Sequence, residues 1–122
     1  MYLIDTHILL WAISEPSKLT QQEKAILIAR DQKIFVSAAS IWEIAIKSQN
    51  GKLSVPNNLE EYIQQFSFDI LSVDFKVAWG IQDLPMYHSD PFDRLIISCA
   101  KSHNLTLITR DKIFKKYPIT LL

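Results

Sequence analysis

The sequence predicts an α/β fold with a central, mainly parallel sheet of about four to five strands flanked by helices. Short apolar runs of strand length alternate with segments of helical periodicity along the whole chain. Such alternation is typical of a parallel sheet, because each parallel connection is a crossover long enough to hold a helix. The chain has 122 residues with 48% hydrophobic side chains, which is enough to bury a core, so we expect one domain over residues 1–122.

The N-terminal elements follow from local signals. Residues 2–4 form an apolar run that predicts a buried strand, and Asp5 comes directly after it. A helical pattern over residues 6–13 follows, and Pro16 should break that helix. A Thr-Gln-Gln-Glu capping box then predicts a second helix over residues 20–31.

The middle of the chain repeats this order. Residues 34–36 predict the second strand, and either Ser37 or Ser40 should cap the helix that comes next. Gly51 should end that helix, because glycine readily takes up the left-handed conformation found after helices. A further helix is expected to begin near Asn58.

In the C-terminal part, the Asp90-Pro91 pair supplies a cap and a first-turn proline for a long helix that should reach His103. Asp74 should cap a shorter helix before it. The remaining strands are expected at residues 70–73 and 105–109, with a short helix through Tyr117 and a last edge strand at 119–122.

Composition excludes several classes of protein. The two glycines are too few for a glycine-rich phosphate loop, and no stretch reaches the roughly 18 apolar residues of a membrane helix. The single cysteine, Cys99, lies in an apolar run and should pack as a small hydrophobe. No basic, apolar leader is present at the N-terminus, so we expect a cytoplasmic protein without membrane association.

Asp5 and Asp111 both follow predicted strands. Ligands of open parallel sheets bind beyond the carboxyl ends of the strands, so these two acids from distant parts of the chain are expected to share one crevice. The alternative is that each merely caps the helix after it. Neither residue decides between these roles by itself.

Glu43 is surrounded by apolar residues, and a carboxylate in such a place is costly unless it is paired or bound to metal. A structural role is equally open. Ser40 and Glu43 match a capping box, and Lys47 stands four residues later, where it could form an ion pair on the helix surface.

Asp90 and Asp93 lie three residues apart at a helix start, where the helix dipole favours negative charge. Asp90 is the natural cap, and Arg94 is expected to pair with it. Asp93 is better placed to face a crevice. His88 lies in the preceding loop; it could touch a substrate phosphate, but an ordinary loop histidine is the simpler interpretation.

Four carboxylates brought together without compensation would repel one another strongly. A hard cation such as Mg²⁺ or Mn²⁺ would resolve this, because such ions take oxygen ligands and keep room for water and a substrate phosphate. The spacing of the three histidines and Cys99 does not fit zinc. The acids therefore predict metal-assisted phosphodiester hydrolysis.

Four segments carry a resemblance to a known family: Tyr2-Leu3-Ile4-Asp5-Thr6-His7, Ser40-Ile41-Trp42-Glu43-Ile44, His88-Ser89-Asp90-Pro91-Phe92-Asp93-Arg94 and Leu107-Ile108-Thr109-Arg110-Asp111. In these segments the chain resembles PIN-domain proteins, specifically VapC-like toxins. The resemblance covers essentially the whole chain, and Asp-Pro-Phe-Asp-Arg is its most specific part. It departs from the family pattern in placing the fourth acid directly after Arg110 and in carrying the additional Asp90.

The resemblance implies that Asp5, Glu43, Asp93 and Asp111 are catalytic and bind one or two Mg²⁺ or Mn²⁺ ions. Thr6 and Thr109 would be hydrogen-bond donors behind them. It also implies an endoribonuclease that cuts RNA, often a structured translation RNA, and a homodimer inhibited by a cognate antitoxin.

Other functions remain as alternatives. An aspartyl-nucleophile phosphatase typically needs a second Asp two residues after the first, and His7 stands there. A non-catalytic PIN-like module that binds RNA or protein would lack acids that this chain has. In a generic α/β domain, every acid would be a cap or a surface ion pair.

Charge does not identify the substrate. The chain has 13 basic and 13 acidic residues, but with four acids committed to metal the rest would carry +4, which suits a phosphate backbone. Basic side chains that could contact RNA are Lys47, Lys52, Lys112, Lys115 and Lys116.

Overall fold

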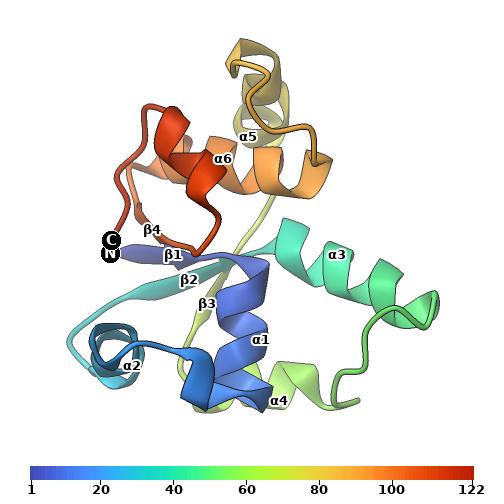
Figure 1. Cartoon of the computed structure of the whole chain (residues 1–122), viewed down its shortest axis with the longest axis vertical. Helices are drawn as coiled ribbons and strands as arrows, with labels where there is room; N and C mark the ends of the chain where they lie inside the picture. The colour runs from blue at the N-terminus through green and yellow to red at the C-terminus, as the bar shows by residue number, and fades with distance from the viewer.

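The computed structural model describes all residues from Met1 to Leu122. Four parallel strands form one sheet in the order β3-β2-β1-β4, with β1 spanning Tyr2–Ile4, β2 Ile34–Ser37, β3 Asp69–Leu71 and β4 Thr106–Ile108. The predicted α/β class and parallel sheet are confirmed. Figure 1 shows the sheet in the middle of the molecule, with helices above and below it and both termini at one side.

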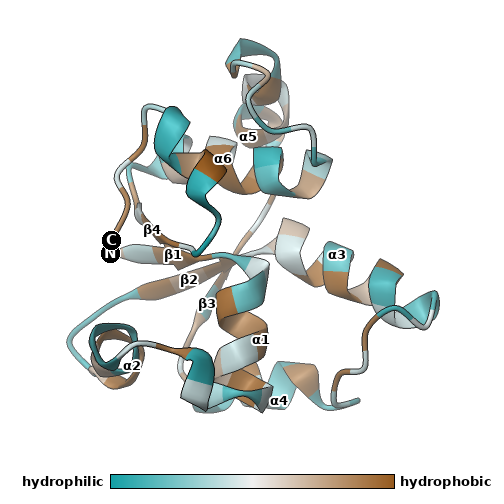
Figure 2. Cartoon of the chain, viewed as in Figure 1, coloured by the Kyte–Doolittle hydropathy of each residue, from teal (hydrophilic) through white to brown (hydrophobic).

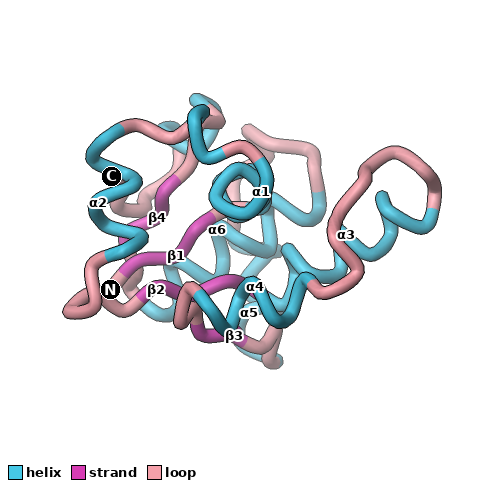
Figure 3. Tube along the Cα trace, turned by 90° about the horizontal axis from the view of Figure 1, so that it is seen from below, coloured by secondary structure: helices cyan, strands magenta, loops and turns pink.

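Six α-helices connect the strands: α1 (Thr6–Ser14), α2 (Gln21–Ile28), α3 (Ala38–Gln49), α4 (Leu59–Gln65), α5 (Phe75–Trp79) and α6 (Pro91–His103). Short 3₁₀ turns at Pro16–Lys18, Gly80–Asp83 and Lys112–Lys116 complete the chain. In Figure 3, α1 and α4 lie in front of the sheet and α6 lies behind it. None of these helices has the length and apolar character of a membrane-spanning segment.

Successive residues of each central strand serve opposite layers, because side chains alternate across a strand. Leu3 and Leu107 pack with α5, α6 and the C-terminal segment. Ile4 and Ile108 pack with α1, α2 and α4 on the other face. In Figure 2 brown predominates in β2 and recurs along α1 and α6, where it alternates with paler or teal residues. The sheet is thus buried on both faces, as parallel sheets require.

Most helix boundaries match the sequence signals. Thr20 and Glu23 form both hydrogen bonds of the capping box, and the side chain of Asp74 accepts from Val77 N–H. Gly51 has a φ of +72°, a left-handed conformation that explains why glycine stands after α3. Cys99 is fully buried, and burial raises the pKa of its thiol to about 11.

Several local predictions need correction. Ser37, not Ser40, caps α3, so the Ser40–Glu43 capping box does not form. Helix α2 ends at Ile28, three residues before the predicted end at Asp31. The expected edge strand at 119–122 is reduced to an isolated bridge between Leu107 and Leu121, because only this short stretch runs beside β4.

Candidate active site at the carboxyl edge of the sheet

Asp5 stands at the carboxyl end of β1, and its side chain is only 4% exposed. One carboxylate oxygen accepts from Ile8 N–H at 2.9 Å and caps α1. The other accepts from the Thr109 hydroxyl at 2.5 Å. Burial raises the pKa of Asp5, against the lowering effect of these hydrogen bonds, and the nearby Asp111 raises it further. Asp5 therefore caps α1 and also lies near a second acid, Asp111.

Glu43 lies on the first half of α3 and is likewise 4% exposed. Its Oε1 accepts from the Thr6 hydroxyl at 2.7 Å, and its Oε2 accepts from Lys47 Nζ at 2.6 Å. Ser40 Oγ lies 3.0 Å from the same Thr6 hydroxyl. The hydrogen bond to Glu43 raises the pKa of Lys47. The buried carboxylate is thus satisfied on both oxygens, and the expected ion pair with Lys47 is present.

Asp93 and Asp111 come together around one histidine. His88 Nε2 lies 3.0 Å from Asp93 Oδ2 and 2.8 Å from Asp111 Oδ2. Asp93 lies in the first turn of α6, and Asp111 lies after β4, directly before the 3₁₀ turn Lys112–Lys116. These three side chains each offer a ligand atom, and the atoms all lie within 4.8 Å of one another. The structure therefore places His88 between two of the acids, whereas the sequence offered it only as a possible phosphate contact or an ordinary loop residue.

Electrostatics connect the four acids. Burial raises the pKa of Asp93 to about 7, and the charges of Asp90, Glu43 and Asp5 add to this effect while His88 opposes it. Thr109 links two of the acids directly, since its hydroxyl donates to Asp5 and accepts from Asp111 N–H at 3.1 Å. The four acids are thus close enough for their charges to influence one another's pKa values.

Asp90 caps α6, as predicted, by accepting from the N–H groups of Phe92 and Asp93 at 2.8 and 3.1 Å. The predicted pairing of Asp90 with Arg94 is wrong. The buried Arg94 guanidinium instead donates to the carbonyl oxygens of Ile81, Leu84, Pro85 and His88, at 2.9–3.3 Å. A buried cation is best satisfied where several acceptors converge, and the chain from Ile81 to His88 supplies them.

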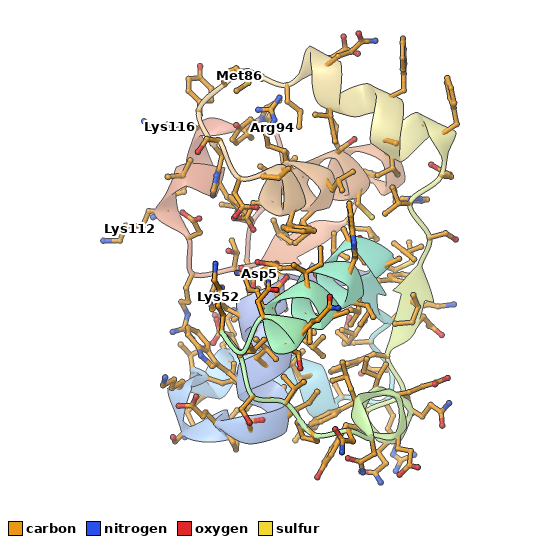
Figure 4. The ribbon with its side chains drawn as sticks, turned by 90° about the vertical axis from the view of Figure 1, so that its right-hand side faces the viewer. Asp5, Lys52, Met86, Arg94, Lys112 and Lys116 are labelled. Atoms are coloured by element: carbon orange, nitrogen blue, oxygen red, sulfur yellow. The ribbon has the colours of Figure 1, made fainter.

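Two basic side chains lie near Glu43. Lys47 and Lys52 line a cavity of about 300 Å³ together with Thr6, His7 and Glu43. In Figure 4, Lys112 and Lys116 project outward from the C-terminal segment. Arg94 and Met86 lie at the other end of the view, on the side of α6 away from Asp5. Both signs of charge thus meet at this edge of the sheet.

The family model of the PIN domain matches residues 2–119. The chain belongs to the PIN-domain family. It is 26% identical to Ribonuclease VapC22 of Mycobacterium tuberculosis over 126 residues, which cover 98% of this chain and 96% of the relative.

Solved structures share the PIN fold. A chain of VapBC2 from Rickettsia felis, solved bound to a promoter DNA fragment, superposes with a TM-score of 0.74 at 22% identity, covering 99% of this chain and 96% of that one. A chain of DNA-bound VapBC from Salmonella typhimurium gives a TM-score of 0.72 at 16% identity, with the same coverage of both chains.

The sequence patterns missed three contacts within this PIN domain. His88 was interpreted as a loop residue, although its position two residues before the cap Asp90 brings it to the start of α6. The Arg110–Glu23 ion pair joins segments 87 residues apart, so no local pattern signals it. Ser40 lies within α3, one turn before Glu43, and that spacing indicates that both face the same side.

Proposed function

We propose that this PIN domain, over residues 1–122, is a metal-dependent endoribonuclease and the toxin of a toxin–antitoxin pair. The observation that carries the proposal is the convergence of Asp93 and Asp111 at the carboxyl edge of the sheet, with Asp5 joined to Asp111 through Thr109. The 26% identical relative is itself named a ribonuclease. The substrate would be RNA, with a structured translation RNA as the expected class.

The donor set fits a hard divalent cation. Asp5, Glu43, Asp93 and Asp111 offer carboxylate oxygens, which are the ligands that Mg²⁺ and Mn²⁺ prefer. Burial is the main cause of the raised pKa of Asp93, and the negative charges of neighbouring acids add to it. A cation bound here would neutralise those charges, which supports the fit. When bound, the ion would lower the pKa of a water molecule and stabilise charge on the scissile phosphate.

The residues of this chain would prepare the site for that chemistry. Thr109 and Thr6 hold the carboxylates of Asp5 and Glu43 at fixed positions by donating hydrogen bonds. The Lys47 ammonium compensates one charge of the cluster through Glu43. Because these contacts form before any substrate binds, little reorganisation is needed at the moment of reaction.

Single-stranded RNA would approach along the basic rim of the site. Lys52, Lys112, Lys115 and Lys116 are all exposed and free to contact phosphates. Tyr87 is 52% exposed, precedes His88 directly, and lies edge-on to Tyr117 at 5.4 Å between ring centroids. The Nζ atom of Lys116 lies 5.7 Å from the centroid of the Tyr87 ring. A fixed, exposed aromatic ring beside a cation is suited to stack an unpaired base.

Similar solved structures suggest the partner of this chain. VapBC2 of Rickettsia felis and VapBC of Salmonella typhimurium were solved bound to DNA, and a similar structure from Klebsiella pneumoniae is a toxin–antitoxin complex. We therefore propose a cognate antitoxin as the partner of this chain. The resemblance to VapC-like toxins also implies a homodimer, and we propose the cytoplasm as its location. A non-catalytic PIN-like binding module is the competing function.

The test is RNA cleavage by the purified protein, free of antitoxin, with total transfer and ribosomal RNA as substrate. Reactions contain Mg²⁺, Mn²⁺ or a chelator, and include a folded Asp93→Asn variant. Asp69→Asn is the matched control, because Asp69 is an exposed carboxylate on β3 that lies 3.9 Å from Lys33. Discrete fragments that need metal and disappear only in Asp93→Asn support the proposal. Equal cleavage by both variants contradicts it, and RNA binding without cleavage favours the non-catalytic module.

A further inference from the structure

The His88 side chain has both of its ring nitrogens committed. Nε2 faces the carboxylates of Asp93 and Asp111, at 3.0 and 2.8 Å. On the other side of the ring, Nδ1 accepts from the backbone N–H of Asp90 at 3.2 Å. A backbone N–H is only a donor, so Nδ1 must be the unprotonated nitrogen. The ring proton is therefore placed on Nε2, where it points at the two carboxylates.

This tautomer argues against the simplest interpretation of the cluster. Three ligand atoms within 4.8 Å of one another could be read as a metal site that includes His88. A histidine that binds metal through Nε2, however, has no proton on that nitrogen and donates from Nδ1 to an acceptor. At Nδ1 of His88 the neighbour is another donor, so the ring is oriented for hydrogen bonding and not for ligation.

The main chain of His88 is equally fixed. Its N–H donates to the Tyr117 hydroxyl at 2.8 Å, and its carbonyl accepts from the buried Arg94 at 3.3 Å. The ring packs against Phe114 with 5.6 Å between the centroids, and only 12% of the side chain is exposed. Every polar group of the residue thus has a partner. A side chain held this firmly can set the position of the groups that it contacts.

We propose that His88 is a positioning residue for the acidic site. Its Nε2–H donates to the carboxylates of Asp93 and Asp111 and so clamps them together. The backbone N–H of Asp90 selects the tautomer that makes this possible. His88 itself is not a ligand of the ion. The clamp holds the like-charged side chains of Asp93, on α6, and Asp111, in the segment after β4, within 4.8 Å of each other, so that both can bind one cation. This inference rests on the proposed function for the identity of the ion, but the tautomer is a property of the metal-free protein.

The first test measures the wild-type protein directly. Nitrogen-15 NMR of the metal-free protein, with the signals assigned by His88→Gln, should show the Nε2–H tautomer. Pulsed electron paramagnetic resonance of the Mn²⁺-loaded protein should then show no coupling from a directly bound imidazole nitrogen. An Nδ1–H tautomer in the first experiment, or a directly bound nitrogen in the second, would overturn the proposal.

The second test compares Mn²⁺ affinities by calorimetry. His88→Ala removes the clamp and should weaken binding by about 10–100-fold, the usual effect of losing a residue that orients metal ligands. His88→Gln places an amide N–H near the former Nε2 position and should recover most of that loss. His103→Ala is the control, because His103 is exposed in the last turn of α6. Wild-type affinity in His88→Ala would contradict the clamp.

The two proposals fail in different ways. If the wild-type protein binds Mn²⁺ but cleaves no RNA, the proposed function fails. The Mn²⁺ affinities of the His88 variants then still show whether His88 positions Asp93 and Asp111. If the wild type binds no Mn²⁺ at all, the metal site fails, and the tautomer in the metal-free protein alone decides whether His88 clamps Asp93 and Asp111.

Discussion

The Thr109 hydroxyl donates to the Asp5 carboxylate at 2.5 Å across 104 residues of sequence. Asp5 follows β1 and Thr109 follows β4, and these two strands are paired in register, with Ile4 opposite Ile108. The contact is thus a direct consequence of parallel pairing, because residues that follow paired positions lie at the same edge of the sheet.

Replacing Thr109 by valine keeps the side chain's shape and removes this donor. The pKa of Asp5 should rise further, because the Thr109 hydrogen bond lowers it. Mn²⁺ affinity, measured by calorimetry, should fall by about 10–100-fold. Thr120→Val is the control, since Thr120 is exposed near the C-terminus. Equal affinities in the two variants would show that Thr109 does not orient Asp5.

The pKa of Asp93 predicts how the stability of the metal-free protein depends on pH. Its folded-state value of about 7 lies above the ordinary 3.8, so the folded protein binds the proton more tightly than the unfolded chain. This contribution to stability is fully present below pH 4 and is lost as pH rises through about 7. Asp93→Asn, which cannot ionise, should therefore melt higher than the wild type by several degrees at pH 8 in chelator, with a smaller difference at pH 5. A difference that does not change with pH would contradict the raised pKa.

The Glu23–Arg110 pair predicts the opposite pH dependence. Burial raises the pKa of Glu23, but the hydrogen bonds from Arg110 and Thr20 and the charge of Arg110 outweigh it and leave the pKa below 4.5. The stabilisation is therefore present at neutral pH and is lost as pH falls through this lowered value.

In urea unfolding at pH 7, Glu23→Gln should lower the free energy of unfolding by about 1–2 kcal/mol, and the loss should shrink at pH 3. Glu15→Gln is the comparison, because Glu15 pairs with Lys18 at 2.8 Å while both side chains are half exposed. An exposed pair of this kind contributes little. Equal losses in the two variants would argue that the Arg110 contact adds nothing.

Arg94 should be important for stability and not only for the site. Its guanidinium holds the chain from Ile81 to His88 through carbonyl oxygens, and no carboxylate pairs with it. Arg94→Ala should lower the free energy of unfolding by about 2–4 kcal/mol, since several charged hydrogen bonds are lost at once. Amide hydrogen exchange should accelerate in this loop. Arg30→Ala, at an exposed arginine, should change neither quantity.

The sequence predicted those parts of the fold that local chemistry determines. The four strands, the capping box at Thr20 and the caps at Asp74 and Asp90 depend on neighbours within four residues, and all are present. Parallel pairing then brings the ends of β1 and β4 together, which is why Asp5 and Asp111 could be assigned to one edge of the sheet before the structure was known.

The contacts that the sequence did not predict depend on long-range packing. Arg94 was expected to pair with the nearby Asp90, but its guanidinium points into a loop whose carbonyl oxygens converge only after folding. His88 was interpreted as an ordinary loop residue because nothing local shows that Asp111, 23 residues away, lies within 2.8 Å. The sequence left Ser37 and Ser40 open as caps of α3, because both are serines within one turn of the predicted helix start, and in the structure Ser37 is the cap.

The chemistry of the RNA ends produced by the Mg²⁺-loaded protein tests the central claim most directly. Attack by a water molecule on the phosphate leaves a phosphate monoester on one side of the cut and a hydroxyl on the other, whereas attack by the neighbouring ribose hydroxyl leaves a 2′,3′-cyclic phosphate. Fragments should carry monoester and hydroxyl ends, and they should be absent with chelator and with Asp93→Asn. Cyclic phosphate ends, or cleavage that persists in chelator, would contradict a metal-dependent hydrolysis at the acidic site.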